Sequence, residues 1–313
     1  MPGLSIVIPV YNNEHSLEPL VEGITKTLRG KLMYELILVN DGSTDSSWQV
    51  IEKIVSEYPA DADPIIAYNL SENYGQENAK MAGLSHASGE YIVFMDADCQ
   101  HDPIHIFAML EQCMNGADVC YANFNNSPAN PFKRLGSSVY NYLAYKLLRK
   151  PKGIYLSSYT MMSQSMRKKV KRYTTPLINI DALVLQHTQN VTQIFVEQRK
   201  SLNKKTNYTP LKLVALFFKL LPGFSIIPLR IIFLCGLTCN SAAMILGVIK
   251  WTIHFSEPSA HFIGTGKLMI LGMGGIILTA LGIIGEYVGK IYVMLSGNKA
   301  FEIRTEISSD DKK

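Results

Sequence analysis

The sequence predicts an α/β domain with a mostly parallel sheet and helices on both faces, followed by an interfacial helix and two transmembrane helices. Two observations carry this prediction: short apolar runs alternate with helical periods as far as Tyr121, and two long stretches almost free of charge follow later in the chain. A chain of 313 residues that is 47% hydrophobic and 18% charged is able to bury a sizeable core. This composition excludes a disordered chain, a collagen-like repeat and a small disulfide scaffold.

The first part of the chain repeats a strand followed by a helix. Apolar runs expected as strands lie at residues 5–9, 35–39, 65–68 and 90–95. Helical spacing of apolar residues predicts helices between them at residues 17–28, 48–55 and 75–88. Strands that are apolar on both sides are typical of a parallel sheet covered on both faces. Ligands of such sheets bind beyond the carboxyl ends of the strands, which here are residues 9–13, 40–44 and 96–100.

Two later stretches, residues 226–249 and 268–290, are long enough to cross a bilayer. The first is interrupted only by Arg230 and by small or uncharged polar residues, and residues 268–284 carry no charge. A span needs about 20 apolar residues. We therefore expect a domain at residues 1–200, a juxtamembrane segment at 201–225, a first span at 226–249, an outer loop at 250–267, a second span at 268–290 and a tail at 291–313.

Basic residues are placed asymmetrically around these two spans. Those before the first span and after the second include Lys204, Lys205, Lys212, Lys219, Lys290, Lys299 and Arg304. Because cytoplasmic loops carry an excess of Lys and Arg, both termini are expected in the cytoplasm, with the protein in the inner (plasma) membrane as a multi-pass protein. Residues 211–221 have the pattern of an interfacial helix, and residues 308–313 are expected to be a solvated, disordered end.

The net charge of +4 is too small to indicate a nucleic-acid partner. Its distribution is more informative, because no acidic residue occurs between Asp118 and Asp181, whereas eleven Lys and Arg do. Such a stretch is expected to face phosphate, either of a ligand or of a membrane.

Acidic residues fall at three of the predicted strand ends, around Glu14, around Asp41 and in the D-x-D sequence of Asp96 and Asp98. Mg²⁺ or Mn²⁺ is usually held by one or two carboxylates together with substrate phosphates. A sparse acidic site therefore implies a substrate that supplies ligands itself, such as a nucleotide diphosphate. The alternative at this stage is a set of solvated loops in which Asp41 or the D-x-D residues cap the helices that follow.

The order and spacing of several segments resemble glycosyltransferase family 2. These segments are S-I-V-I-P-V-Y-N-N-E at 5–14, V-N-D-G-S-T-D at 39–45, N-Y-G at 73–75 with Ala79 and Gly83, S-G-E-Y at 88–91 and M-D-A-D-C-Q at 95–100. Further segments are similar to the membrane part of polyisoprenyl-phosphate glycosyltransferases: K-T-N-Y at 205–208, F-S at 224–225, P-L-R at 228–230 and G-E-Y-V-G-K-I-Y at 285–292. The resemblance covers nearly the whole chain.

This resemblance implies a GT-A-type fold and the inverting transfer of a single sugar from a nucleotide diphosphate sugar, expected to be UDP-linked. The implied acceptor is a polyisoprenyl phosphate, such as undecaprenyl or dolichyl phosphate, at the cytoplasmic membrane face. The implied site residues are Pro9, Tyr11 and Glu14 as the wall of the nucleotide pocket, Asp41 at the base, Asp96 at the ribose and Asp98 at the metal. Mg²⁺ or Mn²⁺ at Asp98 would stabilise the leaving diphosphate.

One segment departs from the family pattern. Lipid-linked enzymes of this type often carry an Asp in a G-D-F-R-L-like segment, proposed as the base, whereas residues 157–162 here read S-S-Y-T-M-M. Asp181 is the nearest downstream carboxylate and is expected to be catalytic, the alternative being a helix cap or a partner of the basic cluster. A polyprenyl phosphate, with a second pKa of about 6, is largely a dianion that needs positive charge more than deprotonation. Residues expected to provide that charge are Lys133, Arg134, Arg199 and Lys205.

Two other functions remain open from the sequence. A processive polysaccharide synthase would need a Q-x-x-R-W acceptor motif, but neither Trp48 nor Trp251 follows an Arg. A non-catalytic membrane scaffold that binds a nucleotide sugar is supported only by the missing Asp motif. Two spans per chain would also allow copies to associate in the bilayer as a homo-oligomer.

Overall fold

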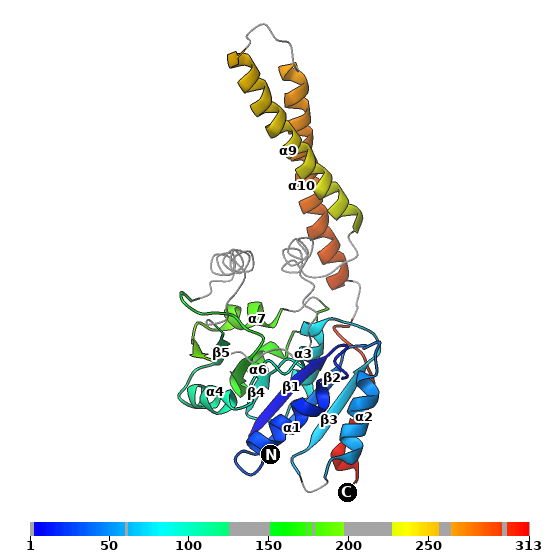
Figure 1. Cartoon of the computed structure of the whole chain (residues 1–313), viewed down its shortest axis with the longest axis vertical. Helices are drawn as coiled ribbons and strands as arrows, with labels where there is room; N and C mark the ends of the chain where they lie inside the picture. The colour runs from blue at the N-terminus through cyan, green and yellow to red at the C-terminus, as the bar shows by residue number, and fades with distance from the viewer. Residues whose placement is uncertain are drawn as a thin grey trace. The chain divides into compact units, whose positions relative to one another are not determined.

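A computed structural model describes residues 3–59, 62–124, 151–173, 175–176, 179–196, 227–256, 264–295 and 299–312. The chain divides into two compact units (Figure 1). The first unit contains the described part of residues 1–221 together with the C-terminal residues from 299 onward, and the second contains the described part of residues 222–298.

A sheet in the order β7-β5-β6-β4-β1-β2-β3-β8 forms the centre of the first unit (Figure 1). Its strands are β1 (Leu4–Val10), β2 (Tyr34–Asn40), β3 (Ile65–Leu70), β4 (Tyr91–Phe94), β5 (Val119–Asn123), β6 (Thr160–Ser163), β7 (Val191–Phe195) and β8 (Ile303–Ser308). The strands β4, β1, β2 and β3 run parallel to one another, as do β5 and β7. The strand β6 is antiparallel to both β4 and β5, and β8 is antiparallel to β3. The predicted, mostly parallel sheet is therefore confirmed, with two antiparallel strands added to it.

Helices cover both faces of this sheet. They are α1 (Leu17–Leu28), α2 (Ser47–Glu57), α3 (Gln76–His86), α4 (His105–Met114), α6 (Gln164–Val170) and α7 (Ile180–His187). Alternate residues of β1 enter different cores: Ile6 and Ile8 pack with residues of α1, α2 and α4, whereas Val7 packs with residues of α3, α6 and α7. Because successive side chains of a strand point to opposite faces, a strand covered on both sides is apolar throughout. All seven residues of β1 are buried.

The C-terminal segment differs from the sequence expectation, which made residues 308–313 a solvated, disordered end. Here β8 pairs with β3 up to Ser308, and a short 3₁₀ turn (Ser309–Lys312) follows it. The hydroxyl of the buried Ser309 accepts the backbone N–H of Ile65 at 3.0 Å. The physical reason is that β3 would otherwise present an unpaired edge, which β8 covers. Residues of the predicted tail thus belong to the sheet.

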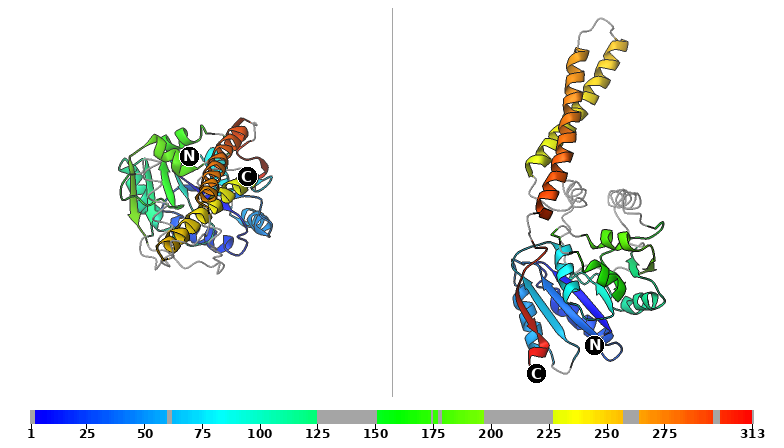
Figure 2. Two further views of the ribbon diagram at one scale, coloured as in Figure 1. Left: turned by 90° about the horizontal axis from the view of Figure 1, so that it is seen from above. Right: turned by 180° about the vertical axis from the view of Figure 1, so that it is seen from behind.

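Two helices, α9 (Ile227–Ser256) and α10 (Thr265–Leu295), form the second unit and pack along each other (Figure 2). Small residues line their contact: a Cβ atom on Gly275 would lie 2.6 Å from Oδ1 of Asn240, and one on Gly282 would lie 2.7 Å from Cβ of Phe233. The Asn240 amide also donates to Oγ1 of Thr279 at 3.3 Å. Close contact at glycine with a polar bond between helices is the packing typical of membrane helices.

Both helices are long and apolar enough to cross a membrane, over Ile232–Ile253 and Thr265–Leu295. The helices extend beyond the predicted spans, so the predicted outer loop 250–267 is shortened from both sides. The reason is that the sequence contains no Gly or Pro between Lys250 and Ser256, so backbone hydrogen bonding continues past the apolar stretch. The predicted interfacial helix at 211–221 lies outside the described residues.

Candidate functional site

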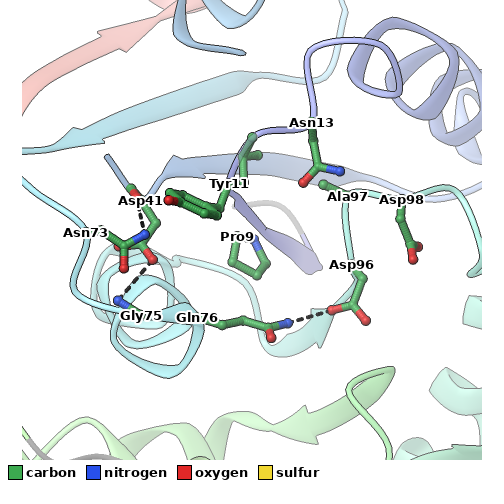
Figure 3. Close-up of a pocket in the computed structure, with 11 residues that line it drawn as sticks. Pro9, Tyr11, Asn13, Asp41, Asn73, Gly75, Gln76, Asp96, Ala97 and Asp98 are labelled. Carbon is green, nitrogen blue, oxygen red and sulfur yellow. Dashed lines mark hydrogen bonds between the residues drawn. The ribbon is translucent and has the colours of Figure 1, made fainter. Parts of the chain in front are cut away.

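A pocket of about 420 Å³ lies at the carboxyl ends of β1, β2 and β4, where the sequence predicted a ligand site (Figure 3). Its lining residues lie at or just after the ends of these strands, or at the start of α3 and in the loop before it: Pro9, Val10, Tyr11, Asn13, Asp41, Asn73, Gly75, Gln76, Asp96, Ala97 and Asp98. Small-molecule sites have volumes of about 300–1,000 Å³, so the pocket has room for a nucleotide-sized ligand.

Asp41 stands at the end of β2 and is 2% exposed. Its carboxylate accepts the backbone N–H groups of Tyr74 at 2.8 Å and Gly75 at 3.0 Å. The Asn73 amide donates to its carbonyl oxygen, and Figure 3 shows this bond and the one from Gly75. Burial raises the pKa of this carboxyl, whereas the two backbone N–H groups lower it. The alternative in which Asp41 caps α2 does not hold, because Asp45 accepts the N–H of Ser47 at the start of that helix. Each carboxylate oxygen has further lone pairs with which to accept a donor from a ligand.

Gly42 allows the loop after β2 to lie directly against the loop before α3. Its φ angle of 61° is left-handed, and a Cβ atom here would lie 2.6 Å from the backbone nitrogen of Asn73. Only glycine meets both conditions without strain. The Asp41 wall of the pocket therefore depends on this residue.

Asp96, the first acid of the D-x-D sequence, is held by side chains from two distant segments. Its Oδ1 accepts from the Gln76 amide at 2.8 Å, and its Oδ2 accepts from Oγ of Ser158 at 2.5 Å (Figure 3 shows the first bond). Ser158 belongs to the segment that departs from the family pattern. This segment therefore places a hydroxyl group against Asp96.

The backbone around Asp98, the second acid, is fixed by a reciprocal pair of bonds with Ser16. The Ser16 hydroxyl donates to the carbonyl of Ala97 at 2.6 Å, and the Cys99 thiol donates to the carbonyl of Ser16 at 3.3 Å. Cys99 has a left-handed φ of 62°, which a non-glycine residue adopts only when its surroundings enforce it. Burial raises the pKa of the Asp98 carboxyl, and the neighbouring Asp96 raises it further.

His101 supports the same segment from inside the domain, where it is 5% exposed. Its Nδ1 accepts the backbone N–H of Asp96 at 3.1 Å, and its ring stacks on Tyr159 and Phe124 at centroid distances of 4.6 and 5.4 Å. Burial lowers its pKa, which favours the neutral imidazole. His101 therefore positions the D-x-D segment from behind.

Asp181 is placed in the first turn of α7 and is not among the residues lining the pocket. The Tyr121 hydroxyl donates to its Oδ1 at 3.0 Å. Burial raises the pKa of Asp181 to about 6; Glu77 raises it as well, whereas Lys80 and the Tyr121 bond lower it. A carboxyl with this pKa is able to exchange a proton near neutral pH.

The other site residues expected from the sequence fall into three groups. Pro9 and Tyr11 line the pocket with the acids discussed above. Glu14 does not line it, and its carboxylate accepts the backbone N–H of Ser46 at 2.9 Å. The residues expected at the acceptor phosphate lie outside the described residues: Lys133, Arg134, Arg199 and Lys205.

Several residues that contact the site were not singled out by the sequence, among them Gln76, Glu77, Lys80 and Ser158. Polar residues in the first turn of a helix that follows a strand end were a usable signal for Gln76 and Glu77. No signal pointed to Lys80 or Ser158, because their contacts depend on tertiary structure.

Within the described ranges no group of three or more His, Cys, Asp or Glu could hold a metal ion. The pocket does present the carboxylates of Asp96 and Asp98, which are hard oxygen donors. This donor set fits Mg²⁺ or Mn²⁺ bound together with the phosphate oxygens of a ligand, and does not fit a site formed by the protein alone.

A pocket beyond the carboxyl ends of parallel strands is the usual ligand site of α/β proteins with an open, mostly parallel sheet. Within that class, residues 5–171 match the model of the family described as glycosyl transferase family 2. The match covers more than half of the chain, and the chain therefore belongs to glycosyl transferase family 2. The prediction of a glycosyltransferase is confirmed.

Curated relatives align with almost the whole chain. It is 29% identical over 301 residues to the undecaprenyl-phosphate 4-deoxy-4-formamido-L-arabinose transferase of Pseudomonas fluorescens (strain SBW25), covering 92% of this chain and 85% of that protein. It is also 29% identical over 318 residues to the protein of the same name from Pectobacterium atrosepticum, covering 98% and 94%.

Among solved structures, glucosyl-3-phosphoglycerate synthase from Mycobacterium tuberculosis in complex with phosphoglyceric acid superposes with a TM-score of 0.51. The match covers 70% of this chain and 79% of that protein at 17% identity. This likeness concerns the fold alone, and the predicted GT-A-type fold is confirmed.

Proposed function

We propose that this glycosyltransferase moves a single sugar, with inversion, from a UDP-linked donor to a polyisoprenyl phosphate at the cytoplasmic face of the inner membrane. The observation that carries the proposal is the convergence of Asp41, Asp96 and Asp98 in one pocket of a chain with two helices apolar enough to cross a bilayer. The names of the relatives, which specify undecaprenyl phosphate, support the class of acceptor.

The donor binds in the acidic pocket. The Asp41 carboxylate accepts the N–H of the uracil base, and Asp96 accepts ribose hydroxyl groups. Tyr11, which is 48% exposed at the pocket, forms the wall of the base site together with Pro9. Asp98 would hold Mg²⁺ or Mn²⁺, and the cation would supply charge stabilisation for the leaving diphosphate.

The acceptor phosphate reacts at the anomeric carbon. An oxygen of the lipid phosphate forms the new carbon–oxygen bond on the face opposite the diphosphate, the bond to the diphosphate breaks, and UDP leaves. When the lipid phosphate arrives as a monoanion, Asp181 accepts its proton. Lys133, Arg134, Arg199 and Lys205 balance the phosphate charge in this proposal.

The chain connectivity supports a membrane hairpin. Residues on both sides of the α9–α10 pair belong to the same unit, since β8 pairs with β3. An even number of crossings leaves both ends of the hairpin on one side of the bilayer, and the surplus of Lys and Arg at those ends favours the cytoplasm. Association of copies through these helices remains a prediction.

The test uses the full chain in lipid nanodiscs with undecaprenyl phosphate, a panel of nucleotide sugars and either Mn²⁺ or Mg²⁺, and measures lipid-linked product. The expected result is one donor that yields product, its loss with EDTA, and a drop of at least about 100-fold in Asp98→Asn. Asp63→Asn, outside the pocket, is the control and keeps the full rate. Nucleotide-sugar binding without product would indicate a scaffold, and a polymeric product would indicate a synthase; either would overturn the proposal.

A further inference from the structure

A cluster of ionisable side chains lies outside the lining of the pocket, around Asp181. It consists of Glu77 and Lys80 on α3, Asp181 on α7 and Tyr121 on β5, and it is called the α3–α7 cluster below. Its members come from three separate parts of the chain. The transfer mechanism above uses only Asp181, so the presence of a buried cation that interacts electrostatically with it requires an explanation.

Lys80 is buried, with its side chain 9% exposed. Its Nζ lies 3.2 Å from Oε1 of Glu77 and 5.8 Å from the centroid of the Phe94 ring. Burial lowers the pKa of Lys80, but the charges of Glu77, Asp96 and Asp181 raise it, and the net direction is upward. Lys80 therefore carries a positive charge that acts on both the pocket carboxylate Asp96 and the carboxylate of Asp181.

Glu77 connects this cation to the helix that carries Asp181. While Oε1 faces Lys80, its Oε2 accepts the backbone N–H of Ile180 at 2.8 Å, at the first residue of α7. The neighbouring Asn78 donates from its amide to the carbonyl of Pro176 at 3.1 Å. The helix α3 thus holds the segment before α7 and the first turn of α7 in place.

The two members of the pair act on Asp181 in opposite directions. The ammonium group of Lys80 favours the carboxylate form of Asp181, and the carboxylate of Glu77 disfavours it. Among the described residues, the third titratable group against Asp181 is the Tyr121 hydroxyl, which favours the carboxylate form by donating to it. The proton affinity of Asp181 is therefore a balance between residues of α3 and β5.

We propose that Glu77 and Lys80 are a positioning pair that fixes the first turn of α7 and sets the protonation state of Asp181 during sugar transfer. This inference rests on the proposed function, in which Asp181 accepts the acceptor proton. Glu77 provides the mechanical connection to α7, and Lys80 provides the charge. A purely structural ion pair would hold α7 equally well but would leave the pH dependence of catalysis unchanged.

The test is the pH dependence of kcat for lipid-linked product in the full chain, comparing wild type with Lys80→Met, Lys80→Arg and Glu77→Gln. The acidic limb is the part of the profile in which kcat falls as the pH is lowered. In Lys80→Met this limb moves to higher pH by about one unit, which lowers kcat at pH 6 by about fivefold. Lys80→Arg retains the wild-type limb. In Glu77→Gln, which keeps an acceptor for the N–H of Ile180, the limb moves to lower pH. Opposite shifts in two variants cannot result from a general loss of structure.

The matched control is Lys53→Met, because Lys53 pairs with Glu18 on the exposed surface. If Lys80→Met does not fold, as judged by its thermal denaturation, the shift of the acidic limb to lower pH in Glu77→Gln still tests the proposal. An acidic limb that stays in place in these variants would belong to the acceptor phosphate, whose second pKa is about 6, and would overturn the inference. Failure of wild type to form product with any donor would overturn the proposed function instead.

Discussion

Ser158 donates a hydrogen bond from its Oγ to Oδ2 of Asp96 across 2.5 Å. This bond joins the segment just before β6 to the end of β4, and so connects the antiparallel part of the sheet to the acidic pocket. The same carboxylate is held on its other oxygen by Gln76, at the first residue of α3. Asp96 is therefore oriented before any ligand binds.

Removal of this bond is expected to weaken donor binding. In Ser158→Ala the Asp96 carboxylate loses a hydrogen bond, and because bonds to charged groups contribute about 1.5–3 kcal/mol, the KM for the donor rises by about tenfold. Steady-state kinetics with varied donor and saturating acceptor measure this change. Ser165→Ala, at an exposed residue of α6, is the control and keeps the wild-type KM. An unchanged KM in Ser158→Ala would show that the bond does not orient Asp96.

The loop contact at Gly42 is expected to be sensitive to a single methyl group. Gly42→Ala combines a left-handed backbone with a contact to Asn73, and we expect a destabilisation of about 2–4 kcal/mol with loss of UDP binding. Gly30→Ala separates the two causes, because Gly30 has a φ of 74° but a Cβ atom there would meet no atom within 4 Å. It is expected to cost about 1 kcal/mol. Thermal denaturation measures the stability of both variants. Equal losses of stability in Gly42→Ala and Gly30→Ala would refute the role of the contact between Gly42 and Asn73.

The pairing of β8 with β3 is expected to contribute to the stability of the catalytic domain. Ser309→Ala leaves the N–H of Ile65 buried without its acceptor, at a cost of about 1–3 kcal/mol. Ser308→Ala, which removes only an exposed bond to the N–H of Asp310, should change stability by less than about 0.5 kcal/mol. Denaturation midpoints of the full chain in detergent compare the two. A larger loss in Ser308→Ala would contradict the placement of the C-terminal segment.

Catalysis is expected to depend on pH through Asp181. Because its pKa is about 6, the carboxylate form prevails above that pH, and kcat should fall as the pH is lowered through this value. Tyr121→Phe removes a bond that favours the carboxylate, so the pKa of Asp181 rises and the acidic limb moves to higher pH. In Asp181→Asn we expect kcat to fall several-fold at pH 6 and below, where the acceptor phosphate is a monoanion, and to change little at pH 8, where it is a dianion. A pH profile of kcat checks each variant, and full activity in Asp181→Asn at pH 6 would remove this residue from the mechanism.

The strands and helices from β1 to β4 could be predicted because their apolar pattern is unambiguous. Every residue of β1 and β2 is buried, and the apolar side of α1 has regular helical spacing. The meeting of Asp41 and Asp96 in one pocket followed from the rule that parallel strands end at the same edge of a sheet.

The later strands could not be predicted in the same way. The strand β6 has only four residues and lies between β4 and β5, an antiparallel insertion that local sequence does not encode. In β8, Arg304 and Glu306 alternate with Ile303 and Ile307, an edge-strand pattern that becomes meaningful only once β3 is known to need a partner. The position of Lys80 against the Phe94 ring of β4 likewise depends on tertiary structure.

In the proposed reaction the enzyme transfers one sugar to each lipid molecule from a donor bound in the acidic pocket. The most direct measurement is the ratio of UDP released to lipid-linked product, with the mass of that product, in a reaction containing undecaprenyl phosphate and the preferred donor. We predict one UDP for each lipid and a product mass one sugar above the acceptor. In Asp98→Asn the rates at which UDP and lipid-linked product form should both fall by at least about 100-fold. Release of UDP without glycosylated lipid, or addition of several sugars to one lipid, would contradict this mechanism.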